Sequence, residues 1–352
     1  MRWPWISLAV ALFAGCTATH PTYRGPGPAP KGAADQALLR CAAAAIDLHQ
    51  RIDRALAGAA PGRPFIEVAP SLRADQRSAL DRVARQIERG IEEIAVEDLT
   101  APFVLDRRLL ARLAGRDRAL ARPGPSAPLA AVIAIHAPET STTAVLARLD
   151  EGPTRVEIWA RTSTTPLLDP ARALELAEQG GERTPLRRAY PSQGLLDALS
   201  ILGTPRASAL AAEAEVDLRA ATSTDTASLT TILARRGGLS PIEANARLSA
   251  IRREPGRSLA AFLAAEALLD IEARGASRPS GGALEARGAR AREARENGAA
   301  PAAVSRPSGG ALEARGGLVA AVFARGLLPP SLLAEAVSDC GDDRGRQGAA
   351  RR

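Results

Sequence analysis

Apolar residues at helical spacing are the feature that most constrains the fold of this chain. They recur every three or four residues in successive stretches, with charged residues between them, as expected for helices that bury one face. The clearest stripe, at residues 71–95, comprises Leu72, Leu80, Val83, Ile87, Ile91 and Ile94. By the same argument we predict further helices at 35–57, 106–121, 167–181, 191–203, 206–221, 224–238, 239–256 and 257–275.

Residues 129–161 break this pattern. Leu129–Ala137 reads LAAVIAIHA, a continuous apolar run rich in β-branched residues that is typical of a buried strand. TTAVLARL and TRVEIWART follow it, and in the second the side chains alternate between apolar and charged, which favours a hairpin. We therefore predict an α+β fold, mainly α, in which helical layers pack against a small antiparallel sheet of about three strands.

The N-terminus has the layout of an export signal. Arg2 precedes an apolar run from Ile6 to Ala14, and this run is too short to cross a bilayer, which needs ~20 apolar residues. Its end, LFAGC, resembles the lipobox of bacterial lipoproteins, in which the cysteine is lipidated and becomes the new N-terminus. The resemblance implies lipidation at Cys16 and a membrane anchor. In a Gram-negative cell, Thr17 after the cysteine favours the outer membrane, facing the periplasm. An ordinary secretory signal and a buried N-terminal helix are the alternatives.

The composition divides the rest of the chain into segments. SRPSGGALEARG occurs twice, at Ser277–Gly288 and Ser305–Gly316, within a Gly/Ala/Arg-rich stretch that lacks large apolar residues. We expect a signal peptide at 1–15, a Pro/Gly-rich tether at 16–34, a mainly helical globular domain at 35–275, a low-complexity linker at 276–316, C-terminal helical segments at 317–340 and a polar tail at 341–352. An alternative divides the globular domain into an α+β part at 35–165 and a helical part at 166–275.

The charge of the chain does not indicate a nucleic-acid binder. The net charge is +7, but the arginines are interleaved with acids, and aromatic residues make up only 3% of the chain. Nucleic-acid binding favours clustered basic residues and aromatic side chains for stacking. We therefore expect no nucleic acid as partner. The expected partners are the membrane, through the lipid anchor, and an envelope protein or an anionic envelope polymer.

Several enzyme classes are excluded by residues that the chain lacks. Lys31 is the only lysine, so a P-loop, an S-x-x-K pair and a Schiff-base lysine within the domain are absent. The three histidines, at 20, 49 and 136, form no H-E-x-x-H motif. We expect no cofactor.

Two groups of residues are weak candidates for chemistry. His136, Glu139 and Ser141 could bring a base, an acid and a hydroxyl together where the first predicted strand ends. His49 and Asp53 have the i,i+4 spacing of half a metal site, although His49 also belongs to the apolar stripe of its helix and fits a core histidine better.

Two further features have simpler interpretations. YPSQG, at 190–194, lacks the first glycine of a nucleophile elbow, so Ser192 is interpreted as a helix N-cap. Residues 232–253 resemble generic helix-turn-helix spacing, but an exported protein does not meet the chromosome.

The sequence therefore predicts a lipid-anchored cell-envelope protein with a non-catalytic structural or interaction role. The alternative is an envelope hydrolase that uses His136, Glu139 and Ser141, and a weaker one is a nucleic-acid-binding protein whose N-terminus only resembles a signal. Cys41 and Cys340 are the two cysteines left after lipidation, and in an oxidising compartment we expect them to form a disulfide.

Overall fold

The fold is built from helices. The computed structural model describes residues 28–57, 72–162, 184–277 and 327–333, of which 77% are helical, and no strand occurs among them. The α-helices are α2 (Ala33–Ala57), α3 (Ala74–Glu92), α4 (Ala101–Ala121), α5 (Ala127–His136), α6 (Thr142–Asp150), α7 (Arg155–Thr162), α9 (Pro185–Ala189), α10 (Gln193–Ile201), α11 (Leu210–Ala220), α12 (Thr226–Arg235), α13 (Pro241–Arg253) and α14 (Arg257–Ser277), with 3₁₀ turns η1 (Val96–Asp98) and η2 (Pro205–Ala209).

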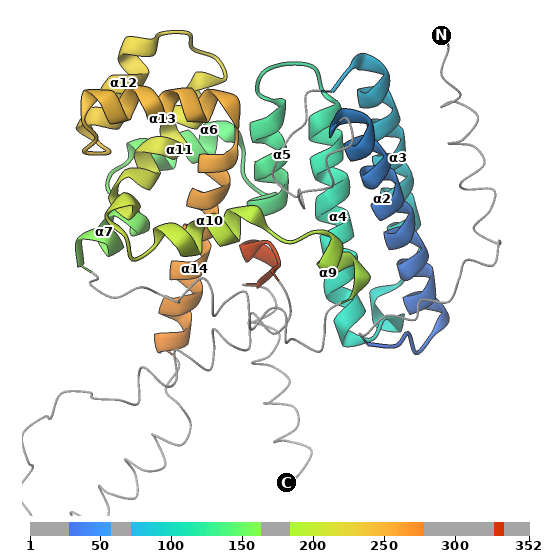
Figure 1. Ribbon diagram of the computed structural model, residues 1–352. Helices are drawn as coiled ribbons and strands as arrows, with labels where there is room; N and C mark the ends of the chain where they lie inside the picture. The colour runs from blue at the N-terminus through green and yellow to red at the C-terminus, as the bar shows by residue number, and fades with distance from the viewer. Residues whose placement is uncertain (1–27, 58–71, 163–183, 278–326, 334–352) are drawn as a thin grey trace, which may run out of the picture.

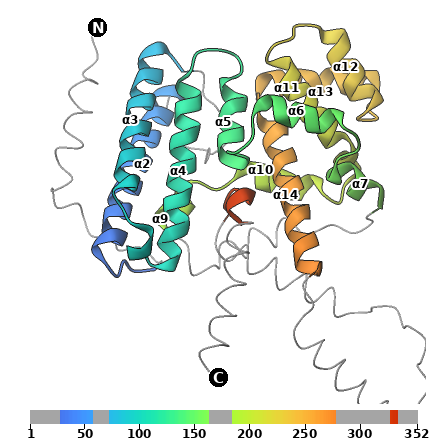
Figure 2. The ribbon, with the colours of Figure 1, turned by 180° about the vertical axis from the view of Figure 1, so that it is seen from behind.

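The helices form two groups that stand side by side (Figures 1 and 2). In the first group α4 packs between α3 and α5, with α2 and α9 beside them. In the second group α14 packs against α10 and α11, and α12 and α13 form a hairpin over α11. One cluster of buried apolar residues runs through both groups, and α5 touches α14. The two groups therefore share a core.

The predicted three-stranded sheet is wrong. All but the last residue of LAAVIAIHA lies in α5, whose first turn contains Pro128. None of the residues of α5 is exposed, so a continuous apolar run fits a helix in the middle of the fold. TTAVLARL forms α6, capped by Ser141, whose hydroxyl oxygen accepts from the Ala144 N–H at 3.1 Å.

The second strand of the predicted hairpin is also a helix, α7. Val156 is fully buried while Ile158 is 50% exposed, whereas a strand would put these two side chains on the same face. A capping box begins α7: the Thr154 N–H donates to Glu157 at 2.7 Å, and the Glu157 N–H donates to the Thr154 hydroxyl at 3.2 Å. The α+β class is therefore replaced by an all-helical one in the described residues.

The helices expected from periodicity are present where the structure describes them. α2 buries the predicted stripe through Leu38, Ala42 and Ala45, and α3 buries Leu80, Val83, Ile87 and Ile91. The predicted third helix begins earlier than expected, at Ala101, because Pro102 fits its first turn.

A short C-terminal segment, residues 327–333, lies in the core between the two groups (Figure 1). The Leu327 carbonyl accepts from the Ser192 N–H at 2.8 Å, at the start of α10, and the Ser331 hydroxyl donates to the Ile135 carbonyl in α5 at 3.1 Å. The segment thus contacts both groups. The predicted signal, most of the tether, the duplicated segments, Cys16 and Cys340 lie outside the described residues.

Candidate functional site

The structure places His136, Glu139 and Ser141 at the junction between α5 and α6, and their role as a reactive centre remains a prediction. His136 is the last residue of α5, not the end of a strand, and its side chain is only 6% exposed. Glu139 and Ser141 are exposed, and the Ser141 hydroxyl accepts the N-terminal hydrogen bond of α6. The hydroxyl oxygen therefore serves as a helix cap, as Ser192 also does for α10, where it accepts from the Leu195 N–H at 3.1 Å.

His49 is instead a core histidine at the centre of a buried polar chain. Its Nε2 donates to Asp117 Oδ2 at 2.7 Å, and its Nδ1 lies 2.5 Å from the Tyr190 hydroxyl. Arg116 Nε donates to the other Asp117 oxygen at 3.0 Å. We call these four residues the His49 network. It connects α2, α4 and the end of α9.

Electrostatics favour the charged form of Asp117 in this network. Burial disfavours the carboxylate, but the neighbouring His49 and Arg116 outweigh burial and lower the pKa of Asp117 from its ordinary value. The carboxyl group has no exposure, and His49 and Tyr190 are 7% and 4% exposed. The network is thus closed to solvent, and its polar groups stabilise the fold rather than meet a substrate.

The predicted metal half-site and disulfide remain predictions. Both ring nitrogens of His49 face protein groups, and the Asp53 side chain lies outside the described side chains. Among the described residues, no group of three or more His, Cys, Asp and Glu side chains is placed to hold a metal ion. Cys41 is half-buried in α2 beside Gly90 of α3, while Cys340 lies outside the described residues.

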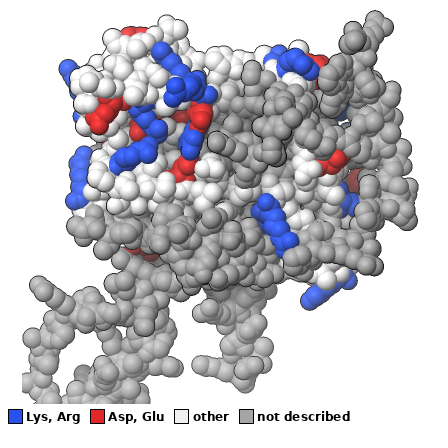
Figure 3. Space-filling model, viewed as in Figure 1, with Lys and Arg blue, Asp and Glu red and all other residues white. Residues whose placement is uncertain are grey.

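An open site lies in the other group of helices. A cavity of about 270 Å³ lies where α10, η2, α13 and the start of α14 meet. In the space-filling view, arginine side chains gather on this side of the molecule with acids among them (Figure 3). We call the cavity the arginine pocket after the four arginines that line it, Arg206, Arg247, Arg253 and Arg257.

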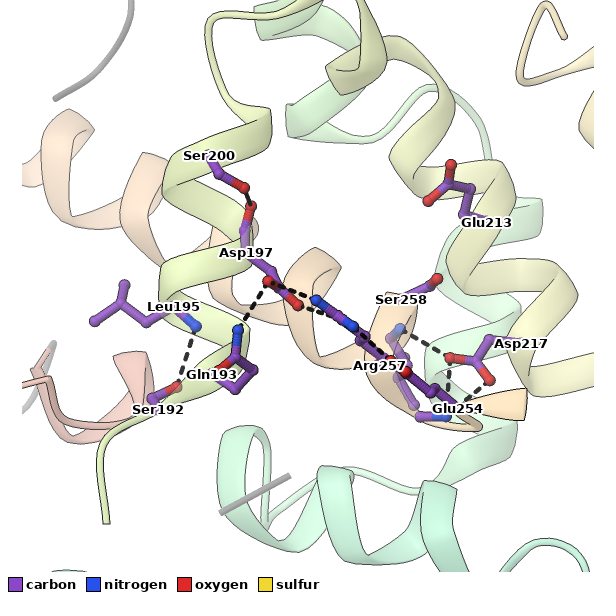
Figure 4. Close-up of polar contacts among 12 residues, drawn as sticks. Ser192, Gln193, Leu195, Asp197, Ser200, Glu213, Asp217, Glu254, Arg257 and Ser258 are labelled. Carbon is purple, nitrogen blue, oxygen red and sulfur yellow. Dashed lines mark hydrogen bonds and ion pairs between the residues drawn. The ribbon is translucent and has the colours of Figure 1, made fainter. Parts of the chain in front are cut away.

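Local structure explains how these arginines meet. Glu254–Gly256 makes a tight turn from α13 into α14, with Gly256 at φ +92°, a conformation that favours glycine. Buried Asp217 of α11 accepts from the Gly256 and Leu259 N–H groups at 2.9 and 3.1 Å, which caps α14 (Figure 4). Ser240 and Glu243 form a capping box that starts α13. The end of α13 and the start of α14 are therefore fixed side by side.

The arginines of the pocket differ in how fully they are paired. Arg257 lies between two carboxylates, donating to Asp197 at 2.8 Å and to Glu254 at 2.5 Å (Figure 4), and these contacts raise its pKa. Arg247 donates to buried Glu213 at 2.5 Å and to the Ser258 hydroxyl at 3.3 Å.

The other two pocket arginines are more available. Arg206 comes only to 4.0 Å from Glu213, and its side chain is 57% exposed. Arg253 is exposed and makes no hydrogen bond or ion pair among the described residues. The pocket therefore presents guanidinium groups with free donors.

A second cavity, of about 350 Å³, lies by α7 and the loop before it, and three of its four charged residues, Asp150, Glu157 and Arg236, are paired. Arg236 donates to Glu157 at 2.9 Å and to Glu215 at 2.8 Å, and burial of Glu157 is outweighed by Arg236, which lowers the Glu157 pKa. This ladder ties α12 to α7 and α11. This second cavity therefore has fewer charged side chains without a hydrogen-bond partner among the described residues than the arginine pocket has.

Sequence reasoning missed both polar clusters. Asp117 lies on the apolar stripe of its helix with Leu110 and Leu113, and an acid in such a stripe signals a buried partner. The pocket arginines are interleaved with acids in the sequence, a pattern that also fits solvated helix faces. The stretch RREPGR, at 252–257, carries the signal that was overlooked: a turn-forming Pro-Gly pair flanked by arginines on both sides.

Comparison of the chain with models of protein families found no match, and comparisons with curated proteins and with solved structures found none either. In the part of the chain that the structure describes, no helix combines the length and apolar character needed to cross a bilayer.

Proposed function

We propose that the protein is a non-catalytic binding protein of the cell envelope, held at a membrane by a lipid on Cys16, and that the arginine pocket takes its anionic partner. The pocket is the observation that carries this proposal. Four guanidinium groups from three elements line one cavity, and Arg253 and Arg206 keep donors that no carboxylate occupies within 3.5 Å. Such groups suit the recognition of carboxylate or phosphate oxygens.

The geometry favours binding over the alternative of an envelope hydrolase. A general base must reach the proton that it abstracts, yet His136 is buried while Ser141 is exposed and its oxygen caps a helix. Nucleic-acid binding by the α12–α13 hairpin is a weaker alternative. Ile242, at the start of α13, is 83% exposed, and an apolar residue there suits a phosphate backbone poorly.

Photocrosslinking in intact cells tests the binding role. A photoreactive amino acid replaces Ser200, which is exposed on the pocket wall, and in a matched control it replaces exposed Arg85 on α3. We expect an adduct from position 200 that position 85 does not give, and its mass identifies the partner class. Equal adducts, or none from position 200, would contradict the proposal, and an adduct with nucleic acid would favour the weaker alternative.

Cys16→Ala tests the anchor separately. Loss of the thiol should release the protein from the membrane fraction and leave an unprocessed precursor, because lipidation precedes cleavage in the lipoproteins that LFAGC resembles. A Cys16→Ala protein that is still cleaved and still membrane-bound would contradict lipidation. A crosslink from position 200 would then support binding without the anchor.

A further inference from the structure

The arginine pocket has more positive than negative charge, although acids lie close to it. Asp197 and Glu254 line the cavity with the four arginines, and Glu213 lies behind Arg247. Four guanidinium groups and two carboxylates thus line the cavity itself, while two further acids close to Arg247, Glu213 and Asp217, are buried. We propose that the arginine pocket binds the phosphoryl group of a small phosphate monoester. This inference rests on the proposed function and names the chemistry of its ligand.

Arg247 supplies the first specific observation. Its Nε is buried and has no hydrogen-bond partner among the described residues, while its Nη2 donates to Glu213 and Ser258. A buried donor without a partner is costly, by about 1–3 kcal/mol, so native structures satisfy such groups with a ligand, an ion or a water molecule. The Arg247 side chain as a whole is 27% exposed and lines the cavity, so an anion in the pocket meets its exposed part, whereas Nε itself is enclosed.

Ser258 supplies a second donor near the same guanidinium group. Its hydroxyl oxygen accepts from Arg247, which leaves the hydroxyl proton to be donated, and the residue is only 3% exposed. The start of α14 is already capped by Asp217, so the donors left for an anion are side chains. Arg247 and Ser258 together favour an anion at the inner wall of the pocket.

The arrangement of the arginines favours a phosphoryl group over a carboxylate. Arg206 comes from η2, Arg247 and Arg253 from α13, and Arg257 from the start of α14, so donors approach from three elements. The three terminal oxygens of a phosphoryl group accept hydrogen bonds in several directions, whereas the two oxygens of a carboxylate lie in one plane. A monoester also carries about −1.5 to −2 charges at neutral pH.

The size of the cavity favours an organic phosphate over a free ion. A water molecule occupies about 30 Å³ in the liquid, so 270 Å³ leaves room for a small organic group beside the phosphoryl group. Ile201, Ala250 and Ala261 also line the cavity and supply apolar surface for an organic group. Glycerol 3-phosphate has this chemistry, and so does the headgroup of an anionic phospholipid.

Calorimetric titration of the full-length, cell-processed protein in a neutral detergent tests the proposal. The probes are glycerol 3-phosphate, acetate and glycerol. We expect glycerol 3-phosphate to bind at least tenfold more tightly than acetate, and glycerol not to bind. Arg253→Gln and Arg206→Gln should each lower the affinity for glycerol 3-phosphate roughly ten- to a hundredfold, because each removes a charge-assisted hydrogen bond. The matched control is Arg235→Gln on α12, an exposed arginine outside the pocket that should leave the affinity unchanged.

Equal affinity for acetate, an unchanged affinity in Arg253→Gln, or no binding of glycerol 3-phosphate would overturn the phosphoryl assignment. An adduct from position 200 would in each case leave the proposed binding role standing, so the two proposals fail separately.

Nanodiscs with and without phosphatidic acid show whether the phosphoryl group belongs to a lipid or to a free small molecule. Suppression of the glycerol 3-phosphate signal by phosphatidic acid supports a lipid headgroup, and an unchanged signal supports a free small molecule.

Discussion

Asp117 and Glu213 are both buried carboxylates that accept hydrogen bonds from basic side chains, yet their surroundings differ. Asp117 is fully enclosed, and its partners His49 and Arg116 are buried as well. Glu213 is buried too, but its partner Arg247 is 27% exposed in side-chain area and lines a cavity. The charged cluster around Asp117 is therefore enclosed in the core of one group of helices, whereas the cluster around Glu213 borders a cavity in the other.

This difference separates polar clusters that stabilise a fold from clusters that can bind. In the His49 network the described polar atoms find partners inside the protein, so a ligand has little to add. In the arginine pocket Arg247 Nε and Arg253 keep donors for which the described residues supply no acceptor. Burial of the partner, and not the identity of the charged residue, distinguishes the two.

Asp117→Ala should produce the largest loss of stability. The substitution leaves His49 and Arg116 buried without their acceptor, and removing one partner of a buried ionic pair costs about 3–5 kcal/mol. Asp81→Ala is the control, because Asp81 forms a surface i,i+4 pair with Arg85 that is worth less than about 1 kcal/mol. Denaturant unfolding measures both, and equal small losses would contradict the structural role of the His49 network.

The stability of the second group should depend on pH through Asp217. Burial raises the Asp217 pKa from 3.8 to about 7 although the Gly256 and Leu259 N–H groups oppose the rise. Because the folded-state pKa is the higher one, the contribution of the protonated group is fully present below about pH 4 and is lost as the pH rises through 7.

Asp217→Asn isolates this effect, because asparagine does not titrate. We expect the free energy of unfolding of the wild type, relative to the variant, to fall by up to roughly 4 kcal/mol between pH 4 and pH 7. Denaturant unfolding at a series of pH values measures the difference. A difference that is the same at every pH would contradict the raised pKa.

A pair of glycine substitutions compares how tightly the two groups pack. A Cβ at Gly194 in α10 would lie 2.9 Å from the Ala260 carbonyl oxygen of α14, so Gly194→Ala should cost about 1–3 kcal/mol. At Gly115 in α4 the nearest atom is 3.8 Å away, and Gly115→Ala should stabilise by about 0.5–1 kcal/mol. Thermal unfolding measures both. Equal effects would show that the α10–α14 contact, on which the pocket stands, is not close-packed.

Helices with one buried face could be predicted from the sequence, and helices buried all round could not. α2 and α3 alternate apolar and charged residues at the helical period, and the structure buries the predicted stripes. α5 has no polar face, so its β-branched run resembles a buried strand. Ser141 and Thr154 are the residues whose types indicate that α6 and α7 are helices, because each accepts a hydrogen bond from a backbone N–H group at a helix start.

The candidate sites were less predictable because their members are distant in sequence. His49 was correctly interpreted as a core histidine from its place in an apolar stripe. Its partners Asp117 and Tyr190 lie 68 and 141 residues away, and only the packing of α2, α4 and α9 brings them together. The arginine pocket likewise depends on the meeting of η2, α13 and α14. Ser192, whose cap bond is local, was predicted correctly.

Hydrogen exchange of the full-length protein, with and without glycerol 3-phosphate, tests the contrast between the two groups most directly. A ligand that binds only the arginine pocket should slow exchange of the backbone N–H groups at the end of α13 and the start of α14, residues 250–261, and leave α2 and α4 unchanged. Unchanged exchange at 250–261, or equal protection at α2 and α4, would contradict the division into a closed structural network and an open binding pocket.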